Sequence, residues 1–258
     1  MSLTIDLVAD LGEGFGSWTM GDDAALLDVL SSANIACGFH AGDPRIMDDT
    51  VAGCARRGVN IGAHPSFPDL VGFGRRAIEA SAEEVRTDVI YQLGALQAFA
   101  AAHGQRVAHL APHGRLGNLV AVREDYAAAV VDAVRQVDDQ LIILAQDGQL
   151  AEQSRSAGLA VGIVGIADRA YQNDGTLVPR SQPGAVISAA DEIARRAVRM
   201  VRDGVVESVD GADIPVRADT ILLHGDSAEA VVTSRTVRAE LEGAGVEIRP
   251  LDATQLRS

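Results

Sequence analysis

The feature that most constrains the fold is an alternation, along the whole chain, of short apolar runs with longer amphipathic stretches. The short runs are rich in β-branched residues, as buried strands are, and the longer ones carry apolar residues at helical spacing. Strands are predicted at 3–10, 33–37, 59–64, 106–113, 141–147, 160–168, 219–226 and 246–251. Helices are predicted over 22–32, 44–58, 81–104, 126–137, 191–204 and 227–245. Repeated strand–helix units predict a parallel sheet covered by helices.

Length and charge narrow the classes of protein that fit this pattern. No linker, low-complexity run or block of charge divides the chain, so residues 1–258 are expected to form one domain. A net charge of -14 repels polyanions, which argues against nucleic acid or an anionic membrane as a partner. No apolar run is long enough to span a bilayer, the first residues do not resemble a secretory leader, and Cys37 and Cys54 lack the spacing of a metal site. We expect a reduced, cytoplasmic protein.

Reactive polar residues stand where five of the predicted strands end. They are Asp10, His64, His113, Asp168 with Arg169, and His224 with Asp226. In parallel barrels and open α/β sheets the active site lies at the carboxyl ends of the strands, because the loops converge there on a rigid scaffold. The long Gly- and Pro-rich segments 65–76 and 169–186 leave the same edge, and loops of that length are usually functional. The pattern predicts an active site at this edge.

The glycine-rich turn DLGEGFG at residues 10–16 raises the question of a nucleotide site. Its glycines do not have the G-x-G-x-x-G spacing, and Asp10 and Glu13 would repel a pyrophosphate. A Walker loop needs a lysine, and the sequence contains none. Two interpretations of the turn remain open, an acidic catalytic rim and a glycine turn whose acids are solvated.

The loops after the second and third predicted strands add further candidates. His40 and Asp43 precede Pro44, which suits the first position of a helix, and a histidine there is as readily structural as functional. Arg75 could bind a carboxylate through two hydrogen bonds, or could form a solvated edge with the adjacent Arg76.

The turn that follows the strand at 106–113 contributes two more polar residues, Arg115 and Asn118. Two other histidines have no such placement, since His103 lies at a helix end and His109 lies inside a strand. We expect both of these histidines to be structural.

Nine stretches, in order and over nearly the whole chain, resemble the LamB/YcsF family. They are DLGEGFG, GDDAALL, SSANIACGFHAGDP, GVNIGAHPSFPDLVGFGRR, YQLGAL, PHG, ADRAYQNDGTLVPRSQPGA, ADTILLHGD and LEGAGVEI. The resemblance implies an α/β fold, an irregular TIM-like (β/α) barrel of the glycoside hydrolase/deacetylase type with about seven parallel strands. It also implies ATP-dependent opening of the lactam 5-oxo-L-proline to L-glutamate, together with 5-oxoprolinase subunits B and C. ATP with Mg²⁺ would then act at the level of that complex.

At three strand ends a polar residue of the family pattern is replaced by a small or apolar one. Where the family usually has DLNCDLGE the chain has DLVADLGE, so Val8 replaces an asparagine. A lysine of KPHGALYN and a glutamate of EVFADR are replaced by Ala111 and Val164. Removing one member of a buried ion pair costs roughly 3 to 5 kcal/mol, whereas losing both can be nearly neutral, so the joint replacement is coherent if the two were partners. We expect weakened turnover, with Arg115 supplying positive charge for binding but not proton transfer.

Three functions remain open. In the first, which we favour, a lactam is opened and protons and water are handled by Asp10, Glu13, His40, His64 and His113. Substrate binding is then assigned to Asp43, Arg75, Arg115, Asn118, Asp168, Arg169, His224 and Asp226. In the second, a deacetylase-like hydrolase holds a divalent metal ion with Asp10, His40, His64 and His113. In the third, a divergent relative binds a small carboxylic acid without the chemistry.

Overall fold

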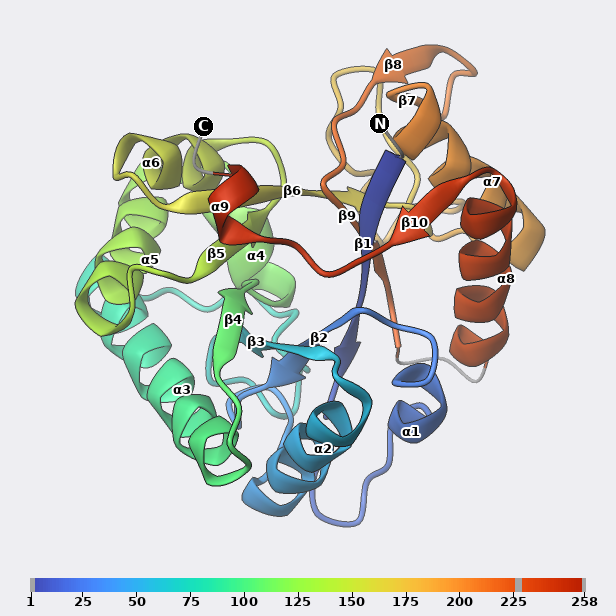
Figure 1. Cartoon of the computed structure of the whole chain (residues 1–258). Coiled ribbons are helices and arrows are strands. Elements are labelled where there is room, and N and C mark those ends of the chain that lie inside the picture. The colour runs from blue at the N-terminus through green and yellow to red at the C-terminus, as the bar shows by residue number, and fades with distance from the viewer. Residues whose placement is uncertain (1–2, 226–228, 257–258) are drawn as a thin grey trace.

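Seven parallel strands close into a barrel in the computed structural model, which describes residues 3–225 and 229–256 (Figure 1). The wall runs in the order β1 (Leu3–Leu11), β2 (Ser32–Ala36), β3 (Asn60–His64), β4 (Val107–Leu110), β5 (Ile142–Ala145), β6 (Ala160–Ile166) and β9 (Thr220–Leu223). It closes because β9 pairs with β1 as well as with β6. The eighth predicted strand, β10 (Val246–Ile248), stays outside this wall and pairs with the amino end of β1. The predicted barrel is confirmed.

Helices surround the barrel on its outside (Figure 1). Five of them match predicted helices within a few residues: α2 (Pro44–Arg57), α3 (Ala82–Ala102), α5 (Glu124–Val137), α7 (Ala190–Arg202) and α8 (Ala230–Gly243). Their starts have local causes. The Asp43 carboxylate accepts the first backbone N–H groups of α2, while Ser81 and Glu84 cap each other's backbone N–H at the start of α3.

Several short elements differ from the prediction. The helix predicted over 22–32 is reduced to α1 (Asp23–Leu26), because the hydroxyls of Ser31 and Ser32 donate to the buried Asp6 carboxylate and hold these residues beside β1, where β2 begins. Three helices were not predicted, α4 (Gly114–Val120), α6 (Gln149–Ser156) and α9 (Ala253–Leu256). The hairpin of β7 (Val205–Glu207) and β8 (Asp213–Pro215) was not predicted either, and it projects near α7 in Figure 1. Elements this short hold too few residues to show a periodicity.

The strands alternate between two faces. Along β1, Leu7, Ala9 and Leu11 belong to the main apolar core that the outer helices complete, so Asp6, Val8 and Asp10 point into the barrel. The barrel interior is therefore partly polar. Since successive interior positions stand at different heights, the carboxyl-end positions bring their side chains together at one mouth of the barrel.

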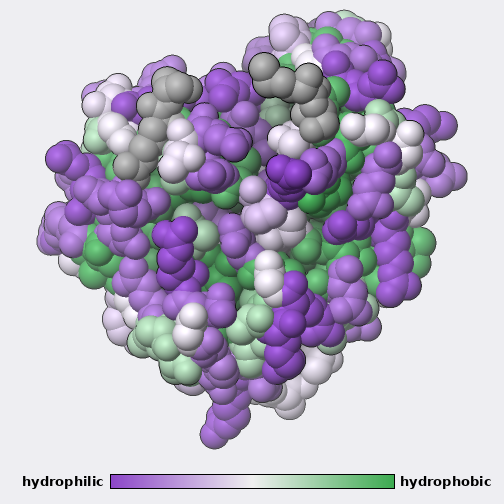
Figure 2. Space-filling model, in the orientation of Figure 1, coloured by the Kyte–Doolittle hydropathy of each residue, from purple (hydrophilic) through white to green (hydrophobic). Residues whose placement is uncertain are grey.

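On the face seen in Figure 2, hydrophilic side chains predominate and apolar ones show between them. Among the helices of the described residues, none has the length and apolar character needed to cross a membrane.

Candidate active site

Five predicted catalytic residues meet at the carboxyl end of the barrel, and each is no more than 6% exposed. Each comes from the end of a strand or from the loop just after it: Asp10 lies near the end of β1 and Glu13 follows that strand, His40 follows β2, His64 ends β3, and His113 stands between β4 and α4. The strand register places these side chains side by side, although they are spread over 104 positions of the sequence (10 to 113). The predicted convergence is thus what the structure shows.

The three imidazole rings pack directly on one another. His40 and His113 stack with ring centres 3.8 Å apart, and Nδ1 of His113 lies 2.9 Å from Nε2 of His64. The second ring nitrogen of His64 and of His113 faces a backbone carbonyl. His64 Nδ1 lies 2.6 Å from the carbonyl oxygen of Ala111, and His113 Nε2 lies 2.9 Å from that of Phe73. A carbonyl oxygen only accepts, so these outer nitrogens carry the hydrogens. In the neutral rings, the two nitrogens that face each other therefore both present lone pairs.

Glu13 joins the rings on one side. Its Oε1 lies 3.2 Å from Nε2 of His40 and 3.5 Å from Nδ1 of His113. One donor atom from each of four residues lies within 4.8 Å of all the others, and these residues are Glu13, His40, His64 and His113. This group could hold a metal ion. It differs from the predicted metal set, because Glu13 takes the place expected for Asp10.

Asp10 instead anchors a chain of contacts that runs into the barrel. Its Oδ1 lies 3.3 Å from Nε2 of His64 and accepts a hydrogen bond from the Asn34 side-chain amide at 2.9 Å. The Asn34 oxygen in turn lies 2.8 Å from Nε2 of His109. His109, predicted to be structural, therefore supports the site through Asn34. Asn34 was missed, although an amide at an interior position of an apolar strand was the available signal.

Burial and charge set the protonation of this group. Burial lowers the pKa of His113 to about 3, and the charge of His64 adds to that effect. Burial also lowers the pKa of His40 well below its ordinary value. Burial opposes ionisation of Asp10, but the charges of His64 and His224 outweigh it and hold the pKa of this carboxyl below its usual range. The site thus combines an ionised carboxylate at Asp10 with neutral imidazoles at His40 and His113.

A second acid–histidine pair stands at the ends of β6 and β9. Oδ2 of Asp168 accepts hydrogen bonds from Nδ1 of His224 at 2.7 Å and from its backbone N–H at 3.2 Å. Burial disfavours the charged form of both residues, but their mutual attraction outweighs it. The pKa of His224 is therefore raised, and the pKa of Asp168 is lowered. On its other side, His224 Nε2 lies 2.7 Å from the guanidinium of Arg180. Arg180, in segment 169–186, was missed by the sequence reasoning.

Arginines gather at the same mouth. The buried guanidinium of Arg169 donates to two backbone carbonyls of segment 169–186 and so holds that loop in place. Burial lowers the pKa of Arg169 to about 10, and the charges of Arg180 and Arg75 act in the same direction, while that of Asp168 opposes them. Arg75 also lies over the ring of Phe73, 4.8 Å from its centre. Positive charge is therefore concentrated here in a chain of strongly negative net charge.

Four buried polar atoms in or beside the cluster lack a hydrogen-bond partner among the described residues. They are Nδ1 of His40, Oγ of Ser66, Nε of Arg115 and Oδ1 of Asp168. A Cβ placed on Gly74 would collide with Ser66 Oγ and approach the His113 ring, so this glycine keeps space open beside the cluster. Arg115 is held nearby by its backbone N–H, which donates to the carbonyl of Gly74 at 2.8 Å. Unpaired buried polar atoms of this kind are typical of places where a water or ligand binds.

A cavity of about 140 Å³ opens onto the cluster. Glu13 and His40 form its polar side, and its apolar side comes mainly from Phe15, Trp18, Met20, Leu70 and Phe73. These apolar residues belong to the loops after β1 and β3. Small molecules can thus approach Glu13 and His40 between two βα loops.

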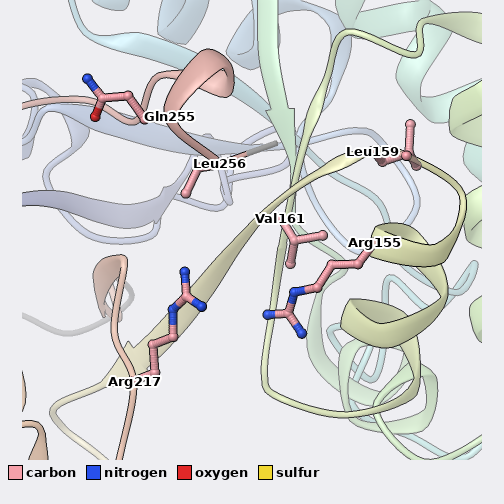
Figure 3. Close-up of a pocket in the computed structure, with 7 residues that line it drawn as sticks. Arg155, Leu159, Val161, Arg217, Gln255 and Leu256 are labelled. Atoms are coloured by element: carbon pink, nitrogen blue, oxygen red, sulfur yellow. The ribbon is translucent and has the colours of Figure 1, made fainter. Parts of the chain in front are cut away.

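A larger cavity, of about 250 Å³, lies near the amino ends of β6 and β9 (Figure 3). Arg155 and Arg217 line it together with residues of α9, but Arg155 lies 3.7 Å from the Asp147 carboxylate and Arg217 lies 3.2 Å from that of Asp219. It is separated from the acid–histidine cluster by the length of the barrel. We therefore place the candidate site at the smaller cavity.

The remaining predicted site residues are placed differently. The Asp43 carboxylate accepts only backbone N–H groups in the described part of the chain, those of Gly16, Arg45 and Ile46. Asn118 is exposed on α4, and Asp226 lies outside the described residues. His103 ends α3 and contacts Asp48 of α2 at 2.7 Å. Substrate binding by Asp43 and Asn118 stays a prediction.

The departures from the family pattern lie inside the barrel. Ala111 belongs to an apolar cluster with Ile142 and Leu144, and Val164 packs against the same cluster. Val8 is fully buried. The positions of the family's lysine and glutamate are thus neighbours in one apolar region, which fits the joint loss of a charged pair.

Comparison with known proteins agrees with this geometry. The model of the LamB/YcsF family matches residues 5–256. The 5-oxoprolinase A subunit from Gluconobacter oxydans (strain 621H) is 49% identical over 249 residues, which cover 96% of this chain and 98% of that protein. The protein of the same name from Acinetobacter baumannii (strain AB307-0294) is 49% identical over 247 residues, 95% of this chain and 97% of that protein.

Solved structures agree as well. The crystal structure of a lactam utilization protein from Thermus thermophilus has a TM-score of 0.92 and 44% identity, and the match covers 96% of this chain and 100% of that one. A family 4 carbohydrate esterase from Streptomyces lividans, with a TM-score of 0.50 and 12% identity over 98% of this chain and 95% of that one, shares the fold alone. From its motifs, its barrel and these relatives, the chain belongs to the LamB/YcsF family.

Proposed function

We propose that this chain is the A subunit of an ATP-dependent 5-oxoprolinase, which opens the lactam ring of 5-oxo-L-proline to L-glutamate together with subunits B and C. The observation that carries the proposal is the buried cluster of two carboxylates and three imidazoles beside a small cavity. It is supported by the 49% identity, over nearly the whole chain, to proteins named as 5-oxoprolinase A subunits. ATP with Mg²⁺ acts at the level of the complex, which we place in the cytoplasm.

Lactam opening needs a base for the attacking water and an acid for the ring nitrogen that leaves. Glu13 and His40 border the cavity, so they are the groups nearest to a bound lactam. In the proposed step Glu13 accepts the proton of the water and returns it to the ring nitrogen, and His40, 3.2 Å away, orients Glu13. A positioned acid–base group of this kind contributes roughly 10² to 10⁴ in rate.

His113, His64 and Asp10 form a second layer behind Glu13. Consecutive contacts of 3.5, 2.9 and 3.3 Å link Glu13 to His113, His113 to His64, and His64 to Asp10. A proton that reaches His113 can pass to His64, where the ionised Asp10 stabilises it. We assign this layer to proton storage and to the positioning of Glu13.

The substrate carboxylate is assigned to the arginines of the barrel mouth. A guanidinium binds a carboxylate through two parallel hydrogen bonds, and Arg75, Arg115 and Arg180 are the candidates for this contact. Arg115 has a buried Nε without a partner among the described residues, which a carboxylate oxygen would satisfy. Asp168, with His224, sets the orientation of Arg180. Arg169 maintains the loop that carries it.

The test is an assay of the chain with and without co-expressed subunits B and C, following 5-oxoproline and ATP together. Glu13→Gln should lower kcat at least 10²-fold, because the carboxylate that accepts the proton is lost. His103→Gln, which changes a histidine on the outer helices, should leave kcat unchanged. Equal rates for Glu13→Gln and the unmodified chain would contradict the proposed role of Glu13.

One observation favours a second candidate, a divergent relative that binds a small acid without turnover. Ala111 and Val164 make apolar a region where the family has a lysine and a glutamate. Binding of 5-oxoproline by the complete complex, without consumption of ATP or release of glutamate, would support this candidate and overturn the enzymatic one.

A further inference from the structure

We propose that Glu13, His40, His64 and His113 bind one zinc-like divalent transition-metal ion. The proposal goes beyond the lactam reaction and does not depend on it. With an ion bound, Glu13 would be a ligand, and activation of the attacking water would fall to the ion in its place. It starts from the separations of the donor atoms. Oε1 of Glu13 lies 3.2 Å from His40 Nε2 and 3.5 Å from His113 Nδ1, and the latter lies 2.9 Å from His64 Nε2.

These separations fit a tetrahedral ion. Ligand atoms that lie about 2.0 to 2.1 Å from such an ion are roughly 3.3 to 3.4 Å from one another. Three of the six separations, 2.9, 3.2 and 3.5 Å, bracket that distance, and all four donor atoms lie within 4.8 Å of each other. Closing the site around an ion would therefore shorten any one separation by no more than about 1.5 Å.

The hydrogen bonds of the rings prepare their inner nitrogens for a cation. His64 Nδ1 donates to the carbonyl of Ala111, and His113 Nε2 donates to that of Phe73. Metal-binding histidines almost always donate their second N–H to such a partner, which fixes the ring and the tautomer. When both rings are neutral, the two inner nitrogens, 2.9 Å apart, direct lone pairs at each other, an arrangement that a cation between them, a metal ion or a proton, would stabilise.

The donor set selects the kind of ion. Three imidazoles and one carboxylate suit zinc and similar transition metals, whereas Mg²⁺ and Ca²⁺ prefer sites made of oxygen atoms. Asp10 lies 3.3 Å from Nε2 of His64 and adds a second negative charge beside the site, so two carboxylates balance the double charge of the ion. Glu13 and His40 also line the cavity, and a bound ion would act there as a Lewis acid.

The test uses the full chain after treatment with a chelator. Zn²⁺ or Mg²⁺ is then added, binding is followed by isothermal calorimetry, and the metal content is measured after dialysis. We expect one zinc ion per chain, a higher thermal midpoint with zinc, and neither effect with Mg²⁺. Addition of Co²⁺ should produce the visible absorption of a tetrahedral site. Failure of the unmodified, folded chain to bind zinc or cobalt would overturn the proposal and indicate a proton shared between the histidines.

Variants locate the ion. His64→Gln and Glu13→Gln should each weaken zinc binding by more than the roughly 10- to 100-fold typical of an outer-shell change. The matched control His103→Gln removes a histidine that contacts Asp48 on the outer helices and should bind zinc normally. Unchanged affinity in His64→Gln would overturn the site. Zinc binding by a complex without lactam activity would leave the metal site standing and remove only the proposed function.

Discussion

The substitution Gly62→Ala tests how the barrel interior supports the site. Gly62 lies on β3 opposite His109 of β4, and a Cβ at this glycine would lie less than 3.0 Å from the Nε2, Cδ2 and Cε1 atoms of the His109 ring. The ring would have to move by more than about 1 Å to regain an ordinary contact. Its Nε2 is the atom that contacts the Asn34 oxygen at 2.8 Å, so the same movement breaks that bond.

The expected magnitude is the sum of two costs. Forcing an extra methyl group into a packed interior costs about 1 to 3 kcal/mol. Leaving the buried Asn34 oxygen unpaired costs about 1 to 3 kcal/mol more. We therefore expect Gly62→Ala to lower the free energy of unfolding by about 2 to 6 kcal/mol. At roughly 2 to 4 °C per kcal/mol for a chain of this size, Tm should fall by at least about 4 °C.

The chain contains a matched control for this substitution. Gly94 lies inside α3, and a Cβ there would meet no atom within 4 Å. Gly94→Ala should therefore raise the free energy of unfolding by up to about 1 kcal/mol, the usual gain at an exposed helical position. Thermal unfolding and urea titration of both variants measure the two effects. The same methyl group should thus act with opposite sign at the two positions.

A double variant separates the clash from other causes. If the His109 ring is the obstacle, His109→Ala should cost less stability in the Gly62→Ala background than in the unmodified chain, because removing the ring also relieves the clash there. The movement of Asn34 should also loosen Asp10 and lower kcat of the assembled enzyme. A Gly62→Ala chain with unchanged Tm and unchanged kcat would refute this account of the interior.

Three further predictions concern the two apolar departures, the Asp168–His224 pair and ATP. Ala111→Lys and Val164→Glu should each destabilise the chain by burying an unpaired charge, while the double variant should recover stability. Denaturant titration measures the three free energies of unfolding. Strictly additive losses would mean that the two positions do not interact. The Asp168–His224 pair should stabilise the fold most between about pH 4 and pH 6.5. Because the pKa of Asp168 is lowered and that of His224 is raised in the folded chain, the stabilisation is lost at lower pH when Asp168 is protonated, and at higher pH when His224 is deprotonated. A stability difference between the unmodified chain and His224→Asn that does not vary with pH would contradict this. Calorimetry of the isolated chain with ATP and Mg²⁺ should show no binding, because the sequence has neither nucleotide-binding glycine pattern, and micromolar affinity would disprove it.

The sequence by itself determined the parallel strand–helix architecture and the edge at which the site lies, and the resemblance to the LamB/YcsF family implied that the sheet closes into a barrel. Alternation of apolar runs and amphipathic stretches is a local property, since each strand or helix carries its own periodicity and its own capping residues. The carboxyl ends of parallel strands share one edge of the sheet, so polar residues at those ends could be placed together without coordinates. Asp10, His64 and His113 were found in this way, and the family was evident from motifs spread over the whole chain.

Only the tertiary structure decided which atoms touch. His64 contacts His113, and Glu13 rather than Asp10 belongs to the four converging donor atoms. Both facts depend on how the strands align when the barrel closes. His109 illustrates the same limit, because a histidine inside a strand can point to either face, and its contact with Asn34 follows from strand register and from the space left by Gly62. Local periodicity fixes elements and their ends, whereas distances between side chains on different strands follow from closure and register, which the sequence specifies only through the packing of the whole barrel.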